Sequence, residues 1–374
     1  MLPLIPILKK SILKAMIQCF VCACMCLLCL LTFTVHTSSA TERDTTNNIT
    51  EIPELKTLWR LSNAGDCDAL YELLSNYWRP EHERLSERKE DDNIDAKLRE
   101  LELSAQSGST EACYMLAVYH YYVKLDVKRS QYYFYKGAEL GDPECMMVVA
   151  DNMLFNEMVA DKKDQIRELY LKAAQAGHAD AYASLALMYL WLVDRGIDPS
   201  QSTEQCEQYL KMAEEADSAM VWTVKGDMYM SGTGRPFNRK EAISCYQKGA
   251  QKGDKKAQFI YGRYCLTSSD AESDGICLLK KSAAQRNIKA IAIIGCAYYN
   301  GLYNVPQDIE KGILFTQFAA YHGDEMAQLL LGQILYEGKN VPQNKELGIE
   351  WIKKSAIQGC PEAQRIMQYY QSTK

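Results

Sequence analysis

The sequence predicts an all-α fold, a solenoid of about eight helix-turn-helix repeats. Three observations lead there. Alanines recur at spacings of 33, 36, 39, 37, 34, 36 and 36 residues. Most are followed three residues later by a glycine, and a second small residue comes a few positions after it. The alanines are Ala105, Ala138, Ala174, Ala213, Ala250, Ala284, Ala320 and Ala356. A period in the thirties in a helix-rich chain is typical of stacked helix pairs.

The N-terminus predicts an export segment over residues 1–40. Three lysines precede AMIQCFVCACMCLLCLLTFTV, 21 residues without charge, and Ser38-Ser39-Ala40 then offers small residues for signal-peptidase cleavage. The apolar run exceeds the roughly 7–15 residues of an ordinary signal core. Residues 15–35 are also long enough to span a bilayer if uncleaved. A cleaved signal peptide and a retained membrane anchor therefore both stay open, and either one places the body outside the cytoplasm, in a periplasm, an extracellular space or the lumen of an endoplasmic reticulum.

Two polar stretches precede the regular repeats. Residues 41–53 are expected to form a tether, and the solenoid is expected to occupy 54–374. Within it, the tract RPEHERLSERKEDDN at 79–93 is charged and nearly without apolar residues, which predicts an exposed loop.

Each later unit is expected to contain two helices. In the last complete unit, apolar residues at helical spacing predict a first helix from Asp324 to Tyr336, and a second follows Pro342 as far as Ser355. Gly338 and Gly359 then serve as turn glycines, because glycine permits the left-handed conformation that ends a helix. Gly332, inside the first helix, is expected instead to let the partner helix approach closely, as are Gly226, Gly262 and Gly295.

Composition limits the range of functions. The chain has 42 basic and 48 acidic residues, and the first 40 residues hold three lysines and no acid, which leaves 39 against 48 in the body. An acidic body predicts no nucleic-acid binding, which needs a basic footprint. Fourteen cysteines include five in the apolar run and nine in the body, and none of the nine body cysteines forms a CxxC pair, so no metal site is expected.

The repeat grammar resembles that of the SEL-one-like repeat (SLR) family, which is related to the tetratricopeptide repeat. The resemblance rests on GDMYMSGTGRPFNRKEAISCYQKGAQKG at 226–253 and on the segments 293–328 and 331–364. It implies a right-handed α/α superhelix that serves as a protein-binding scaffold rather than an enzyme. A few cysteine-rich, exported members bind penicillin, so an envelope protein with β-lactam-binding or hydrolase activity is the alternative. The two SxxK matches, SILK at 11–14 and SERK at 86–89, are not followed by SDN or KTG.

We therefore expect no catalytic residue and no cofactor, and a partner that is another protein of the envelope or of a host. In a solenoid the first helices usually line the inner face, so polar and aromatic residues there that lie off the small-residue stripe are the binding candidates. They are Tyr121, Tyr122, Trp191, Arg263, Tyr299, Gln333 and Tyr336.

One cysteine pair is a disulfide candidate. Cys265 lies near the end of a first helix and Cys277 near the start of the second, with a polar turn between them. Two antiparallel helices joined by such a turn bring these ends together, and export would allow oxidation.

Overall fold

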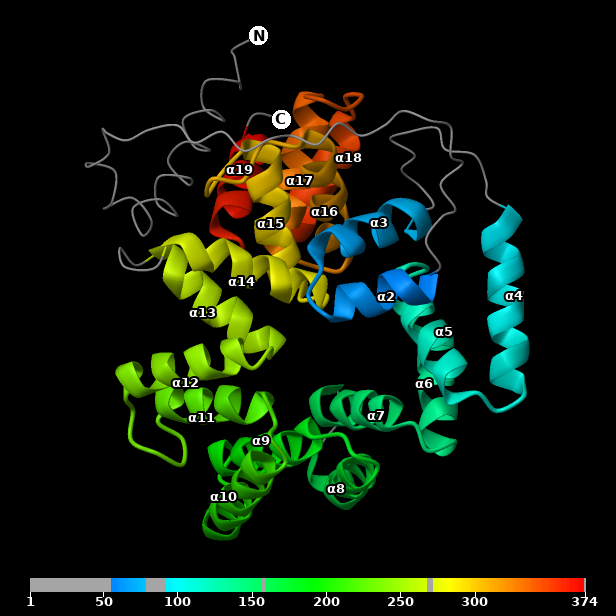
Figure 1. Ribbon diagram of the computed structural model, residues 1–374. Coiled ribbons are helices and arrows are strands. Elements are labelled where there is room, and N and C mark those ends of the chain that lie inside the picture. The colour runs from blue at the N-terminus through cyan, green and yellow to red at the C-terminus, as the bar shows by residue number, and fades with distance from the viewer. Residues whose placement is uncertain (1–54, 79–91, 157–158, 268–271, 373–374) are drawn as a thin grey trace, which may run out of the picture.

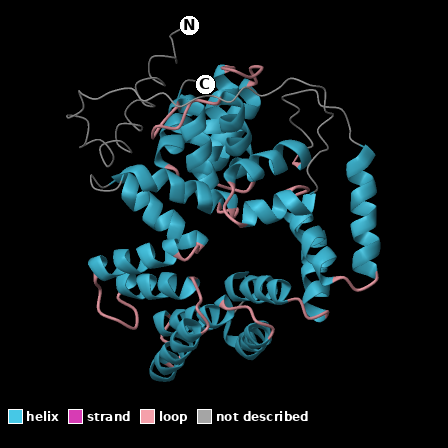
Figure 2. Ribbon diagram, viewed as in Figure 1, coloured by secondary structure: helices cyan, strands magenta, loops and turns pink. Residues whose placement is uncertain are grey.

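The computed structural model describes residues 55–78, 92–156, 159–267 and 272–372. The predicted export segment 1–40 and tether 41–53 lie outside these residues, as does nearly all of the charged tract. In the described part every regular element is a helix, and loops join them (Figure 2). The helices are α2 (Leu55–Asn63), α3 (Cys67–Tyr77), α4 (Asp92–Gln106), α5 (Thr110–Tyr122), α6 (Val127–Glu139), α7 (Pro143–Asn156), α8 (Val159–Gln175), α9 (Asp180–Asp194), α10 (Pro199–Glu215), α11 (Met220–Ser231), α12 (Arg239–Gln251), α13 (Lys255–Thr267), α14 (Glu272–Ala284), α15 (Ile288–Asn300), α16 (Ile309–Tyr321), α17 (Glu325–Glu337), α18 (Lys345–Ile357) and α19 (Pro361–Ser372).

From α5 to α18, seven packed helix pairs follow one another along the described chain. The predicted all-α solenoid of helix pairs is therefore confirmed. In the last complete pair, the first helix begins after Asp324, whose side chain caps it by accepting from Met326 N and Ala327 N. The second begins at Lys345, after Asn344 caps it in the same way. Both helices lie within two residues of the predicted bounds. The predicted loop 79–93 ends earlier than expected, because α4 begins at Asp92.

The turns that separate one unit from the next use the predicted glycines. Seven of them have φ between +89° and +99°, where other residues are strained: Gly65, Gly108, Gly141, Gly177, Gly253, Gly323 and Gly359. At the two places where the alanine series lacks a following glycine, Asp217 and Arg286 adopt left-handed values of φ, 56° and 62°. The turn geometry is thus retained where the glycine is not.

The glycines inside first helices are contact points between the helices of a pair, as predicted. A Cβ placed on Gly295 would lie 2.9 Å from Thr316 N, and one on Gly226 would lie 2.6 Å from the ring of Tyr246. Real Cβ atoms do not approach other atoms so closely, so a larger residue would push the helices apart. Ala117 and Ala186, at the equivalent positions of other units, are fully buried.

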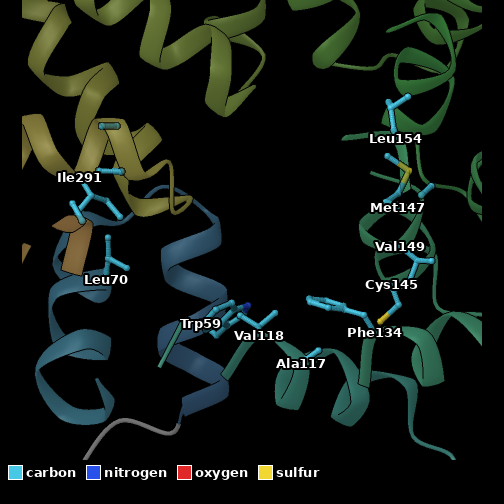
Figure 3. Close-up of a cluster of buried hydrophobic side chains, with 14 of the residues drawn as sticks. Trp59, Leu70, Ala117, Val118, Phe134, Cys145, Met147, Val149, Leu154 and Ile291 are labelled. Atoms are coloured by element: carbon cyan, nitrogen blue, oxygen red, sulfur yellow. The ribbon is translucent and has the colours of Figure 1, made fainter. Parts of the chain in front are cut away.

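The solenoid curves until its N-terminal helices meet α14 and α16 (Figure 1). The N-terminal helices α2 and α3 pack against α14 and α16, and not along α4, which follows them in sequence. Ser62 Oγ donates to the carbonyl oxygen of Ala284 at 2.5 Å, across 222 residues of sequence. The close-up in Figure 3 shows Trp59 of α2 directed toward α5 beside Val118, and Leu70 of α3 facing Ile291 of α15. The helices from α2 to α16 therefore form a closed ring around one large core, and α17, α18 and α19 continue beyond it.

Candidate functional site

An apolar pocket lies at the C-terminal end of the solenoid, where α17, α18 and α19 meet. Its lining is almost entirely hydrocarbon and consists of Gln333, Tyr336, Ile349, Ile352, Ile366, Met367 and Tyr370. A small core of its own, separate from the large one, packs beneath α18 and α19 around Leu329, Ile352, Cys360 and Ala363. The pocket therefore brings together two of the seven sequence-predicted residues, Gln333 and Tyr336.

Close packing of α17 on α18 fixes the position of Tyr336. A Cβ on Gly348 would lie 2.8 Å from Tyr336 N, so only glycine lets the two backbones approach this closely here. The carbonyl oxygen of Tyr336 accepts from Gln343 Nε2 at 3.0 Å, which ties the end of α17 to the following turn. The Tyr336 ring stays half-exposed at the pocket, and Lys345 Nζ lies 5.9 Å from its centre.

The pocket exists because α19 is a first helix without a described second helix beside it. Ile366, Met367 and Tyr370 are half-exposed, whereas the corresponding faces of earlier first helices are covered by the second helix of their own unit. Tyrosine and methionine suit such a surface, since both offer large contact area and methionine adapts its shape to a ligand.

Tyr121 and Tyr122 lie elsewhere, at the junction where α5 meets α16. Tyr121 is 42% exposed, and its ring centre is 6.0 Å from that of His322. Tyr122 is half-buried and stacks on Phe318 at 6.2 Å. His322 Nε2 lies 3.2 Å from the Tyr122 carbonyl oxygen, which can only accept, so this nitrogen carries the proton. Burial lowers the pKa of His322 to about 4, although this hydrogen bond opposes the shift. The structure thus gives Tyr122 a role in ring closure.

Trp191 and Arg263 stand apart from both places. Trp191 on α9 is half-buried, and the guanidinium of Arg195 stacks on its ring at 3.3 Å. Arg263 on α13 is exposed and lies 5.4 Å from the ring of Phe259, one turn earlier on the same helix. The structure does not join either residue to the pocket of α17–α19.

Tyr299 is only 7% exposed, which argues against its selection as a contact residue. Its hydroxyl accepts from Asn340 Nδ2 at 3.5 Å, and its carbonyl oxygen accepts from Gln307 Nε2 at 2.9 Å. A Cβ on Gly312 would lie 2.5 Å from Tyr299 N, so the second helix covers this end of α15. Helical spacing places Tyr299 and Tyr336 at equivalent positions, but Tyr299 is buried whereas Tyr336 is half-exposed.

The structure does not contain the predicted disulfide between Cys265 and Cys277: both thiols are free in it, Cys265 buried and Cys277 exposed. The close contact of Gly262 with Gly275 gives the reason: a Cβ on either would lie within about 3 Å of the other's carbonyl oxygen. Gly275 therefore faces α13. Successive helical residues are rotated by about 100°, so Cys277, two positions later, points away from α13.

The sequence did not lead to five lining residues, Ile349, Ile352, Ile366, Met367 and Tyr370, because candidates were sought only on the first helices and every unit was treated alike. The signal available was the helical spacing of Ile366, Met367 and Tyr370 along α19. In the described part of the chain, no group of histidine, cysteine and acidic side chains is arranged to hold a metal ion. No described helix is long and apolar enough to cross a membrane. Both SxxK matches lie outside the described residues.

The family model described as Sel1 repeat matches residues 110–142, 167–178, 179–218, 226–254, 288–324 and 325–360. A search of curated proteins found no match.

Three solved structures are similar. One is c5321, described as a protective antigen in uropathogenic Escherichia coli with an SLR fold, at 25% identity and a TM-score of 0.40; the match covers 71% of this chain and 57% of that one. The second is a Sel1 repeat protein from Oxalobacter formigenes, with 20% identity, a TM-score of 0.43 and coverage of 89% and 98%. The third is a structure described as a sel1 repeat protein from Klebsiella pneumoniae, with 19% identity and a TM-score of 0.28; the match covers 64% of this chain and 98% of that one.

Proposed function

Because the chain belongs to the Sel1 repeat family, whose members typically mediate protein–protein interaction, we propose that it is an exported scaffold that binds another protein through the pocket of α17–α19. The single observation that carries the binding site is the half-exposed apolar lining contributed by three helices at the end of the solenoid. A partly exposed apolar pocket offers a place where apolar side chains of a partner can be buried, so it supports a binding role.

The chemistry of the lining indicates what the partner presents. Isoleucine and methionine side chains form the floor, and Tyr336 and Tyr370 contribute aromatic surface with polar hydroxyls. Such a site suits one or two apolar side chains on a partner segment, with backbone or side-chain acceptors at its edge. Lys345 beside Tyr336 adds a positive charge at this edge, so acidic residues next to the apolar anchor would strengthen binding.

The proposal of export rests on the sequence of residues 1–40, a basic start followed by an uncharged run and a small-residue cleavage site. Cell fractionation and identification of the mature N-terminus test it. Export predicts either a chain that begins near Thr41 in an extracytoplasmic fraction or an intact chain in the membrane fraction. A full-length chain in the cytoplasmic fraction would contradict it.

The experiment that tests the binding site is photo-crosslinking in the source cells. A photoreactive phenylalanine derivative replaces Tyr336 in one variant and Tyr132 in another. Tyr132 is the matched control, because it is 59% exposed and lies on a second helix far from the pocket. A covalent adduct of defined mass is expected from position 336 and not from position 132. A second test truncates Tyr336 and Tyr370 together to alanine, which should abolish the adduct formed by a probe placed at Gln333. Identical adduct patterns from positions 336 and 132 would remove the pocket as the binding site.

A further inference from the structure

The two ends of the ring meet through a specific interface between the α2–α3 pair and the helices α14 and α16. Besides the bond from Ser62 to Ala284, Lys311 Nζ pairs with Asp68 Oδ1 at 2.9 Å. The indole of Trp78, which is 3% exposed, packs edge-on against two rings of α16 at 5.4 and 5.7 Å. In an ordinary solenoid each unit contacts only its neighbours in sequence, so these contacts are additional to the stack.

The sequence of α16 is adapted to this interface. Five positions before the inter-unit turn, most second helices carry a lysine, at Lys136, Lys172, Lys248, Lys281 and Lys354. The equivalent residue of α16 is Phe318, which is fully buried under Trp78. Three residues later, where α8 and α12 have Gln175 and Gln251, α16 has Tyr321, the second ring that Trp78 contacts. Among the second helices from α6 to α18, α16 is the one with aromatic residues at both positions, and Trp78 contacts both rings.

The polar groups at the junction are incompletely paired. Among the residues that the structure describes, none accepts a hydrogen bond from the buried Trp59 Nε1, Trp78 Nε1 or Arg286 Nη1. Arg286 stacks on Trp59 at 4.0 Å. A buried donor without an acceptor loses its hydrogen bonds to water on docking, which reduces the net free energy that holds the ring closed. The aromatic contacts favour docking, while these donors favour release.

We propose that the α2–α3 pair is an exchangeable docking element: the aromatic face of α16, together with α14, receives this pair from the same chain or from a second copy of the chain. In the second case two copies exchange their N-terminal pairs and form a dimer.

The connection between the pair and the rest of the chain permits exchange. Thirteen residues, 79–91, separate Trp78 from the start of α4, and an extended chain spans at most about 3.3–3.6 Å per residue. Every contact of the closed ring can form identically between two copies, which is the condition for domain swapping. A tethered pair competes at an effective concentration in the millimolar range. The wild-type chain is accordingly a closed monomer at micromolar concentration, and exchange appears when closure within one chain is blocked.

Complementary variants test the proposal. Trp78→Ala damages the pair and leaves the receiving face intact, whereas Phe318→Lys damages the face, by giving α16 the lysine of its sister helices, and leaves the pair intact. Neither variant can close its own ring or pair with itself. In an equimolar mixture, the pair of the Phe318→Lys chain can dock on the face of the Trp78→Ala chain. Light scattering after size exclusion should show the monomer mass for each variant alone and twice that mass for the mixture. Hydrogen exchange in α3 of the Phe318→Lys chain should slow only in the mixture.

A second set of variants, with reversed charges, tests the proposal if Trp78→Ala or Phe318→Lys does not fold. Asp68→Lys and Lys311→Asp each place like charges opposite one another, and their mixture restores two opposite-charge contacts between chains. The double variant, with both changes in one chain, restores closure and is the control that should stay monomeric. Association of either complementary mixture supports exchange. Two mixtures in which each protein keeps the mass and exchange rates it shows alone, with helicity unchanged, would overturn it.

Discussion

Gly332 of α17 and Gly348 of α18 face each other across the last complete helix pair. A Cβ on Gly332 would lie 2.7 Å from the carbonyl oxygen of Gly348, and a Cβ on Gly348 would lie 2.7 Å from that of Gly332. Both nearest atoms belong to backbone, which cannot move aside as a flexible side chain can. This contact sets the distance between the two helices and, with it, the geometry of the pocket at their end.

Replacement of Gly332 by alanine should destabilise the chain. Alanine favours an unconstrained helix by about 0.5–1 kcal/mol over glycine, so a glycine without close neighbours would gain stability from this change. Here overpacking against α18 should outweigh that gain and cost about 1–3 kcal/mol. Thermal unfolding by circular dichroism measures the result. The reciprocal change, Ala186→Gly at the equivalent site of α9, should cost only about the propensity difference. A higher melting temperature for Gly332→Ala would show that the helices separate without strain.

Tyr170→Phe should cost more stability than Tyr246→Phe. The two tyrosines occupy similar positions in different units, and each donates to an aspartate 19 residues earlier: Tyr170 to Asp151 at 2.6 Å and Tyr246 to Asp227 at 2.8 Å. Asp227 keeps a second partner, Lys256 Nζ at 2.7 Å. Burial raises the pKa of Asp151, and the bond from Tyr170 opposes that shift. Removing the Tyr170 hydroxyl therefore leaves a poorly solvated carboxylate and should cost about 1–3 kcal/mol at neutral pH.

The pH dependence of the two tyrosine variants separates this mechanism from simple loss of packing. Protonation removes the buried negative charge of Asp151. The loss of unfolding free energy caused by Tyr170→Phe should therefore shrink as the pH falls toward 4, while the loss caused by Tyr246→Phe should change little. Denaturant unfolding at two pH values measures both. Equal deficits at both values of pH for Tyr170→Phe would show that the carboxylate is not the cause.

His322 should make the closed ring sensitive to acid. Burial lowers its pKa from 6.5 to about 4, so the folded chain favours the neutral ring. The contribution of the neutral His322 ring to the free energy of unfolding is fully present above pH 6.5 and is lost progressively as the pH falls from 6.5 to about 4. This contribution amounts to about 1–3 kcal/mol. Asp324 acts in the opposite direction, because burial raises its pKa from 3.8 to about 6, and its contribution is lost as the pH rises through that range.

The comparison of wild type with His322→Gln isolates the histidine, since Asp324 is common to both. The stability of the wild type relative to the variant should fall between pH 6.5 and pH 4, and a histidine NMR titration should give a value near 4. Protection of Tyr122 and its neighbours from hydrogen exchange should fall in step. A titration near 6.5 would contradict this account of the junction.

The cysteines of α13 and α14 should differ in reactivity. Cys277 is exposed, whereas Cys265 is fully buried, and burial raises the pKa of its thiol. A thiol reagent should therefore modify Cys277 in the native chain and Cys265 only after unfolding. Mass spectrometry of the labelled peptides decides the order. Protection of both sites, relieved together by a reducing agent, would show instead that they are bonded.

Much of the fold is local and was readable from sequence. The turn glycines, the capping residues Asp324 and Asn344 and the interior glycines act within one helix pair, so their spacing alone predicts their roles. The same reasoning selects Gln333 and Tyr336, which line the pocket, but their role in binding stays a prediction. The other lining residues of the pocket lie on α18 and α19, and a repeating pattern does not reveal how these two helices expose them.

The sequence by itself determined the helix pairs, their order and the small-residue contacts, because each depends on interactions between residues close in the chain. The tertiary structure decided where the ends of the solenoid meet, and with it the burial of Trp78, Phe318 and Tyr122. It also decided that Tyr299 is covered and that Cys277 points away from Cys265. These outcomes depend on the rotation of each helix and on its accumulation over many units. The periodic pattern constrains this accumulated rotation only weakly. Contacts between residues far apart in the chain, such as the pair of Asp68 and Lys311, 243 residues apart, depend directly on the accumulated rotation.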